Sequence, residues 1–91
     1  MKFDKFDFYI GDKLYCARVV KRLTQNDMAK MISKKMKEDG RKKGISQQSY
    51  AYYEKGERSI PMDVFTYACN ILSIDRNKLF NEACDYIKLE E

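Results

Sequence analysis

Apolar side chains recur every three or four positions along most of the chain, which is the spacing of amphipathic α-helices rather than of strands. The pattern predicts five helices, over about 8 or 11 to 22, 25–38, 47–55, 61–72 and 76 to about 89. The positions expected to face the core are Ile10, Leu14, Ala17, Leu23, Met28, Ala29, Ile32, Met36, Val64, Phe65, Ala68, Cys69, Leu72, Leu79, Phe80 and Ala83. We therefore expect one compact all-α, five-helix domain spanning residues 1–91.

Helix-capping residues support these boundaries. Thr24 precedes the second helix, and Asp27 stands at the position of a capping box. The other expected signals are Ser46 and Asp75 as N-caps, Pro61 in the first turn of the fourth helix, and Gly40 and Gly56 as helix ends.

The third predicted helix, within GISQQSYAYYEKGERSIP, combines glutamines with three tyrosines. Its helical spacing turns Ser49 or Tyr50, together with Tyr53, inward. The outward positions are then Gln47, Gln48, Ala51, Tyr52 and Lys55. A glutamine amide can donate to N7 of adenine and accept from its N6 amino group, so an exposed Gln-Gln pair suits base reading in DNA. Solvated surface glutamines are the alternative interpretation.

The positive charge of the chain is concentrated in KKMKEDGRKK, residues 34 to 43. This segment has six basic and two acidic residues, and its net charge of +4 equals the formal net charge of the whole chain. A local excess of this kind indicates a polyanionic partner. A solvated, flexible lysine loop is the alternative.

Composition excludes several other classes of function. There is no histidine, and the cysteines, Cys16, Cys69 and Cys84, form no CxxC pair, so we expect buried thiols, no metal and no cofactor. No nucleophile–base pair or phosphate-cradling glycine loop is visible, so we expect no enzyme. Without an apolar run long enough for a membrane span or a signal peptide, we expect a cytoplasmic protein of a bacterial cell or phage-infected host, with no membrane partner.

Taken together, LTQNDMAKMI and GISQQSYAYYEKGERSIPMDVFTYACNILSIDRNKLF resemble the lambda-repressor-like helix-turn-helix family of the Cro/cI or XRE type, over about residues 10–80. SQQSYAYYE is similar to the recognition helix of lambdoid phage repressors. The matching positions are Leu14, Arg18, Leu23, Thr24, Gln25, Ala29, Glu54, Gly56, Arg58, Asn77, Lys78, Leu79 and Phe80.

The resemblance implies a role for each matching residue. Bases would be read by Gln47, Gln48 and Tyr52, and phosphates contacted by Gln25, Ser49, Lys55 and Arg58. The opposite charges of Arg18 and Glu54, at matching positions, predict a structural ion pair between the first helix and the end of the third. Tyr52 departs from the family, which more often displays a polar or basic side chain there, so the preferred base sequence stays open.

A second departure is an insertion of about 11 residues, near 33–43, between the second and third helices. The apolar stripe of Met28, Ile32 and Met36 predicts that its first half lengthens the second helix. The loop GRKKG would then bring Arg41, Lys42 and Lys43 toward the start of the third helix as phosphate contacts.

The resemblance implies a sequence-specific regulator of transcription that binds double-stranded DNA, most simply a repressor. One helix reads few base pairs, so we expect a homodimer on a near-palindrome. The C-terminal extension, 81–91, offers Tyr86, Ile87 and Leu89 as a dimer surface, unless this helix only covers its own core. No effector-binding domain is expected in 91 residues. The alternative function is a protein-interaction module, an antitoxin or inhibitor that reuses the same fold.

Overall fold

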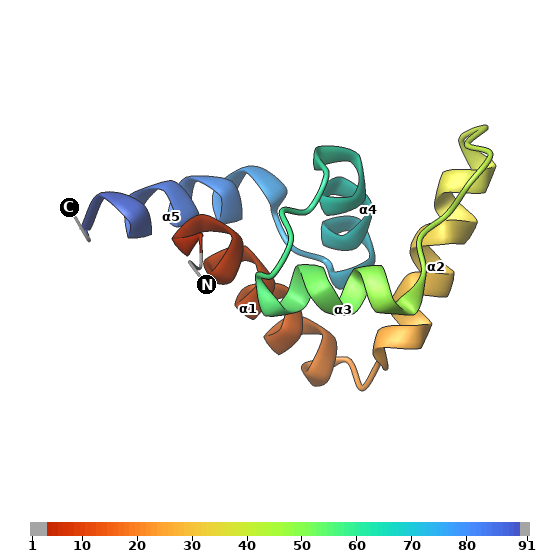
Figure 1. Ribbon diagram of the computed structural model, residues 1–91, viewed down its shortest axis with the longest axis horizontal. Helices are drawn as coiled ribbons and strands as arrows, with labels where there is room; N and C mark the ends of the chain where they lie inside the picture. The colour runs from red at the N-terminus through yellow and green to blue at the C-terminus, as the bar shows by residue number, and fades with distance from the viewer. Residues whose placement is uncertain (1–3, 90–91) are drawn as a thin grey trace.

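The computed structural model describes residues 4–89, with the backbone alone for Leu89. Its described part consists of five α-helices joined by turns and loops, and it contains no strand. The helices are α1 (Lys5–Val20), α2 (Gln25–Glu38), α3 (Gln47–Lys55), α4 (Met62–Leu72) and α5 (Arg76–Leu89). The expected all-α, five-helix organisation is therefore present (Figure 1). No described helix is long and apolar enough to cross a membrane.

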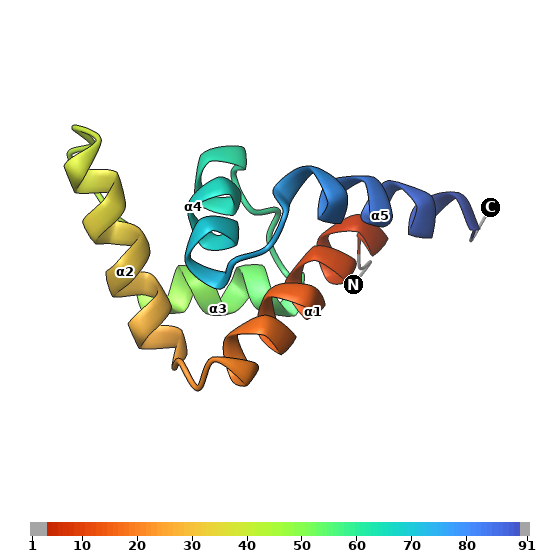
Figure 2. The same cartoon turned by 180° about the vertical axis from the view of Figure 1, so that it is seen from behind.

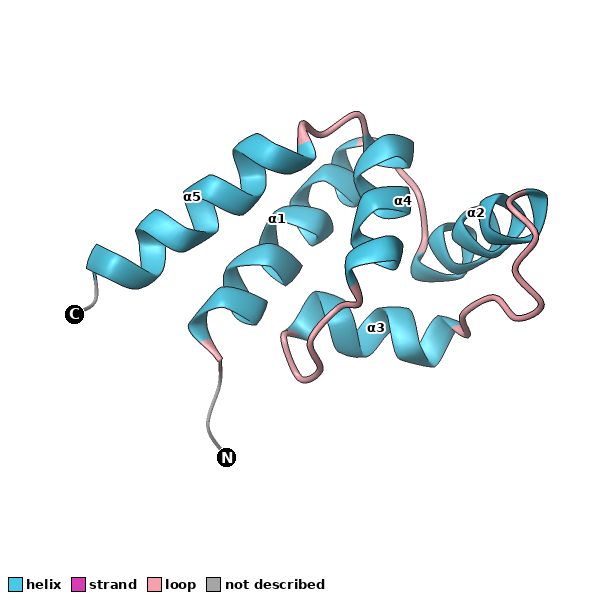
Figure 3. Cartoon of the chain, turned by 90° about the horizontal axis from the view of Figure 1, so that it is seen from above, coloured by secondary structure: helices cyan, strands magenta, loops and turns pink. Residues whose placement is uncertain are grey.

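Helix α1 is central to the arrangement, because it packs against α3, α4 and α5, while α2 packs against α3 and α4. Seen from behind, α1 runs between α3 and α5 (Figure 2). The view from above shows α1 and α5 side by side, with α3 running from near α1 toward α2 (Figure 3). Of the predicted core positions, all are buried except Ala17, Leu23 and Phe80, which are half-buried at its edge.

Helix α1 begins earlier than the sequence pattern predicted. Its N-cap is Asp4, whose carboxylate accepts a hydrogen bond from the Asp7 amide (3.1 Å). The added turns have a packing partner, because the Phe6 ring meets Phe80 of α5 edge-on at 5.3 Å between centroids. The helix also ends sooner, at Val20, since Arg22 has a left-handed φ of 59°.

The contact between α1 and α3 depends on Gly11. A β-carbon at this position would overlap the backbone carbonyl oxygens of Tyr53 and Glu54 in α3. Glycine therefore lets the two helices approach more closely than any other residue would allow. This approach fixes the C-terminal half of α3 against α1.

Helix α2 has the predicted capping box. The Thr24 hydroxyl accepts from the Asp27 amide, and the Asp27 carboxylate accepts from the Thr24 amide, both at 2.9 Å. The helix continues to Glu38, as the apolar stripe predicted, and Gly40 follows with a φ of 87°. Pro61 differs slightly from expectation, because it is the N-cap of α4 and not a residue of its first turn.

The segment between α2 and α3 returns along the side of α2 (Figure 1). Ser33 holds it there, since the Ser33 hydroxyl donates to the Ile45 carbonyl (3.1 Å) and accepts from the Ile45 amide (3.0 Å). Gly44 is required at this crossing, because a β-carbon would overlap the Ser33 side chain. This Ser33–Ile45 clip sets where the chain begins α3.

Candidate nucleic-acid interface

One side of α3 is anchored by a buried ion pair. Arg18 Nε donates to Glu54 Oε2 (2.7 Å) and Arg18 Nη2 donates to Glu54 Oε1 (3.0 Å), so the contact is bidentate. The remaining guanidinium nitrogen, Nη1, donates to the Leu23 carbonyl (2.7 Å). The Glu54 side chain is only 2% exposed and that of Arg18 11% exposed. The ion pair expected from the sequence is thus present, and it links α1, the α1–α2 turn and the end of α3.

Gln25 belongs to this network. Its Nε2 donates to Glu54 Oε1 (3.1 Å), so the amide nitrogen expected to meet a phosphate is bonded inside the protein. The hydrogen bond from Arg18 to Glu54 raises the pKa of the Arg18 guanidinium, which stays charged at every physiological pH. Gln25 therefore connects the start of α2 to the end of α3, and this hydrogen bond uses one of the two N–H donors of its amide.

Tyr50 completes the inner side of α3. The side chain is fully buried, and among the described residues its hydroxyl has no hydrogen-bond partner. Burial, followed by the nearby charge of Glu54, raises the pKa of the Tyr50 hydroxyl, so the group stays neutral. The ring supplies packing, and Tyr53 is half-buried beside it. The inward assignment of these two tyrosines is correct.

The other side of α3 displays a connected row of polar and aromatic groups. Gln48 Nε2 donates to the Tyr52 hydroxyl (3.2 Å), and the Arg58 guanidinium lies over the Tyr52 ring, 4.3 Å from its centroid. Gln48 and Arg58 are exposed and Tyr52 is half-buried. Each contact reduces the conformational freedom of a side chain that would otherwise be mobile. We call Gln48, Tyr52 and Arg58 the outer row.

The remaining α3 candidates lie around the outer row. Gln47 and Lys55 are exposed at opposite ends of the helix. Ser49 is half-buried and shares the N-terminal cap, because its amide donates to the Ser46 hydroxyl (3.0 Å) and its own hydroxyl accepts from Ser46 (3.1 Å). The expected base-reading and rim residues therefore lie on one helix, and Ser49 is already engaged in the cap.

The basic loop does not gather its three cations at the start of α3. Arg41 Nη1 donates to Asp63 Oδ2 of α4 (2.6 Å), and the Tyr67 hydroxyl donates to Asp39 (2.6 Å). These contacts hold the loop beside α4, at the end of α2 that lies far from α3 (Figure 1). The sequence-based placement of Arg41 is wrong, because an acidic partner was available on α4. Lys42 and Lys43 are exposed.

A groove between α2 and the start of α3 contains Lys34 and Lys37 from the basic segment 34–43, together with Lys30, which the sequence analysis did not single out. Its volume is about 530 Å³, and it is lined by Asn26, Ala29, Lys30, Ser33, Lys34, Lys37, Ile45, Ser46 and Gln47. The signal was available, since Lys30, Lys34 and Lys37 are spaced at i, i+4 and i+7 and so share one face of a helix. Counting charge along the chain did not separate this face from the loop, because the basic segment 34–43 includes both the end of α2 and the loop.

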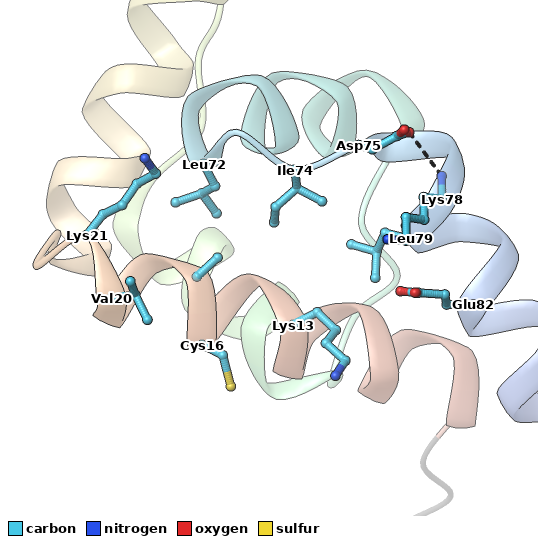
Figure 4. A pocket seen from close by; sticks show the side chains of 11 residues that line it. Lys13, Cys16, Val20, Lys21, Leu72, Ile74, Asp75, Lys78, Leu79 and Glu82 are labelled. Carbon is cyan, nitrogen blue, oxygen red and sulfur yellow. Dashed lines mark hydrogen bonds between the residues drawn. The ribbon is translucent and has the colours of Figure 1, made fainter.

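A second groove, of about 570 Å³, lies between α1 and α5 (Figure 4). The side chains of Cys16, Val20, Leu72, Ile74 and Leu79 give it an apolar surface. Its charges are of both signs, with Lys13, Lys21 and Lys78 alongside Asp75 and Glu82. The two grooves thus differ in charge, since the lining of this groove carries both signs and the charged residues that line the α2–α3 groove are all lysines.

Of the C-terminal candidates, Tyr86 packs within the chain. The Tyr86 ring lies against Tyr9 of α1, with centroids 4.9 Å apart, and Ile87 is half-buried. The side chain of Leu89 lies outside the described residues. At Tyr86, the structure therefore has the alternative arrangement, a last helix that covers its own core.

The cysteines also differ from expectation. Cys69 is buried, Cys84 is half-buried and Cys16 is exposed on α1, so the prediction of three buried thiols is wrong for Cys16. Burial raises the pKa of the Cys69 thiol to about 11. The sequence misleads here because Cys16 lies one position from the inward stripe and faces the α1–α5 groove.

Comparison with known proteins finds no protein-family model that matches this chain, and no curated protein or solved structure that matches it significantly.

Proposed function

We propose that this protein is a lambda-repressor-like helix-turn-helix protein that binds double-stranded DNA in a sequence-specific way and regulates transcription. Helix α3 would enter the major groove, with Gln47, Gln48 and Tyr52 toward the base edges. Arg58 and Lys55 would meet phosphates at the margin of the groove. The simplest regulatory action is repression of bacterial or phage type, by occupation of an operator.

The observation that carries this proposal is the division of α3 into two sides. The inner side is fixed by Tyr50 and by the bidentate Arg18–Glu54 pair. The outer side presents Gln48 hydrogen-bonded to Tyr52, with Arg58 stacked on the same ring. A rigidly held helix with a pre-ordered polar surface loses little conformational entropy on binding, which favours discrimination between closely similar ligands.

A dimer follows from the small reading surface. One recognition helix contacts few base pairs, so useful specificity in a genome requires two half-sites about 34 Å apart. Tyr86 packs on Tyr9 within one copy, so it does not identify the surface that joins the two copies. The dimer is part of this proposal, and the symmetry of the selected DNA site tests it.

Binding-site selection from random DNA tests the proposal. The wild-type protein should enrich a near-palindrome with half-sites about one helical turn apart, and footprinting should protect both. The Gln47→Ala/Gln48→Ala double variant serves as a matched control, because both residues are exposed and the fold should be unaffected. Failure of the wild-type protein to enrich any sequence would rule out sequence-specific binding.

A protein-interaction module is the second candidate, and α1 favours it. Phe8, Tyr15 and Val19 are each 47–48% exposed, and their spacing of i, i+7 and i+11 places them along one side of α1. Aromatic and aliphatic side chains of this kind are common at protein interfaces. Salt separates the two candidates, since DNA affinity must fall steeply as salt rises, whereas an apolar contact weakens little.

A further inference from the structure

We propose that Lys30, Lys34 and Lys37 form a clamp for the DNA sugar-phosphate backbone, which holds one strand beside the bases that α3 reads. This inference rests on the proposed DNA-binding function and assigns it a phosphate site that lies on α2 instead of the basic loop. The lysine row, as we call these three residues, is separate from the outer row of α3.

The lysine row is positioned next to the base-reading residues. All three lysines line the same groove as Gln47 and Ser46 at the start of α3. At a rise of about 1.5 Å per residue, Lys30 and Lys37 are about 10.5 Å apart along the axis of α2. A DNA strand carries one phosphate per about 3.4 Å of duplex axis, so a row of this length can meet two or three successive phosphates.

The groove is electrostatically uniform. Among the described residues, none of the side chains that line it is acidic, whereas the α1–α5 groove includes Asp75 and Glu82. The three lysines form no ion pair within the described part of the chain. Lys30 is close enough to Asp27 for its charge to help lower the pKa of that carboxyl, but none of the three ammonium groups is held in an ion pair, so each can contact an external anion. Arg41 offers a contrast, because Asp63 already occupies its guanidinium.

The shape of the groove is also fixed. Its floor includes Ser33 and Ile45, which are joined by the reciprocal hydrogen bonds of the Ser33–Ile45 clip. The clip sets the separation between the lysine row and the start of α3. A linear array of cations at a set distance from a base-reading helix fits a continuous strand of phosphates better than a single free anion.

Salt-dependent DNA binding tests the clamp. The test variant is Lys30→Gln/Lys34→Gln/Lys37→Gln, measured on a selected site and on unrelated duplex DNA across a range of salt concentrations. Its matched control is Lys13→Gln/Lys21→Gln/Lys78→Gln, which removes the same charge around the α1–α5 groove. A third variant, Lys30→Arg/Lys34→Arg/Lys37→Arg, keeps the charge in place. Circular dichroism and thermal unfolding verify that each variant folds.

The clamp predicts a specific combination of results. In the test variant, affinity should fall for every sequence, base preference should be unchanged, and the log–log salt slope should become shallower by about 1.8 to 2.7, at about 0.9 per phosphate. The control should change the slope by less than half as much, and the arginine variant should retain it. Equal changes in the test and control variants would overturn the clamp and leave DNA binding intact. Absence of wild-type DNA binding would overturn the proposed function, and the clamp with it.

Discussion

Two ion pairs among the described residues are nearly equal in length but lie in very different surroundings. Arg18 and Glu54 meet at 2.7 Å with side chains 11% and 2% exposed, while Arg41 and Asp63 meet at 2.6 Å with side chains 48% and 32% exposed. The first joins α1 to the end of α3, and the second joins the loop to α4. Judged by distance alone, the two pairs would be expected to contribute equally to stability.

Desolvation is what separates the two pairs. A buried charge that loses its partner has no water to replace it, so breaking a buried pair on one side is costly. An exposed pair exchanges its partner for solvent at little cost. The buried Arg18–Glu54 pair, which we call the inner pair, therefore controls whether α3 is held against α1. The exposed Arg41–Asp63 pair only tethers a loop. Four measurements test this difference.

The largest effect is expected for Arg18→Ala. This change leaves Glu54 buried with only Gln25 as a hydrogen-bond partner, so the free energy of unfolding should fall by about 3–5 kcal/mol in urea denaturation. The double variant Arg18→Met/Glu54→Leu should recover most of the loss, because it leaves no unpaired charge. An Arg18→Ala protein as stable as wild type would show that the inner pair is effectively solvated.

A smaller effect, on binding rather than folding, is expected for Gln47→Ala and Gln48→Ala. Because the inner pair fixes α3 from the opposite side, the free energy of unfolding should change by no more than about 0.5 kcal/mol. Discrimination at one or two base pairs per half-site should drop by about 1–3 kcal/mol. Binding to a panel of single-base changes in the selected operator measures this. A uniform loss across the panel would mean that the glutamines do not read bases.

Arg41→Ala should have a minor effect on stability. The exposed pair is expected to contribute about 0.2–1 kcal/mol to the free energy of unfolding, and less at high salt. The DNA salt slope should stay at the wild-type value, since Asp63 and not a phosphate is the partner of Arg41. A shallower slope in this variant would indicate that Arg41 contacts a phosphate, which would contradict the structure.

The smallest expected effect is on the stability of the folded state at acid pH. The hydrogen bond from Arg41 holds the pKa of the Asp63 carboxyl below its usual value of 3.8. A group with a lowered pKa stabilises the folded state fully above the unfolded value and loses that contribution as pH falls through the folded value. The wild-type protein should therefore lose a little stability below pH 3.8, beyond the loss seen in Asp63→Asn. Identical acid unfolding curves for the two proteins would show that the pair does not form in solution.

Much of the fold could be predicted from sequence, because helix periodicity and capping are local. The limits of α2 and α3, the inward tyrosines and the Arg18–Glu54 pair were all predicted from spacing, from capping residues or from the resemblance noted in the sequence. The start of α1 could not be predicted in this way. Its first turn is stabilised by Phe6 packing on Phe80, a contact between residues far apart in the chain.

The candidate site shows the same limit. Gln47, Gln48 and Tyr52 could be identified by helical face, but the stacking of Arg58 on Tyr52 depends on how the turn after α3 folds back. Arg41 was misplaced because its partner, Asp63, lies on another helix. Sequence identifies which residues share a face of one helix, and it does not reveal which charges meet across helices.

The Ser33–Ile45 clip also divides the chain into parts that can be altered independently. Two hydrogen bonds and the close contact of Gly44 with Ser33 fix the backbone just before α3, so changes at the loop tip, 40–43, are not passed on to the helix that follows. The tip is consequently a suitable point for attachment. A fluorophore or peptide tag inserted there would report on the protein while leaving the position of α3 unchanged.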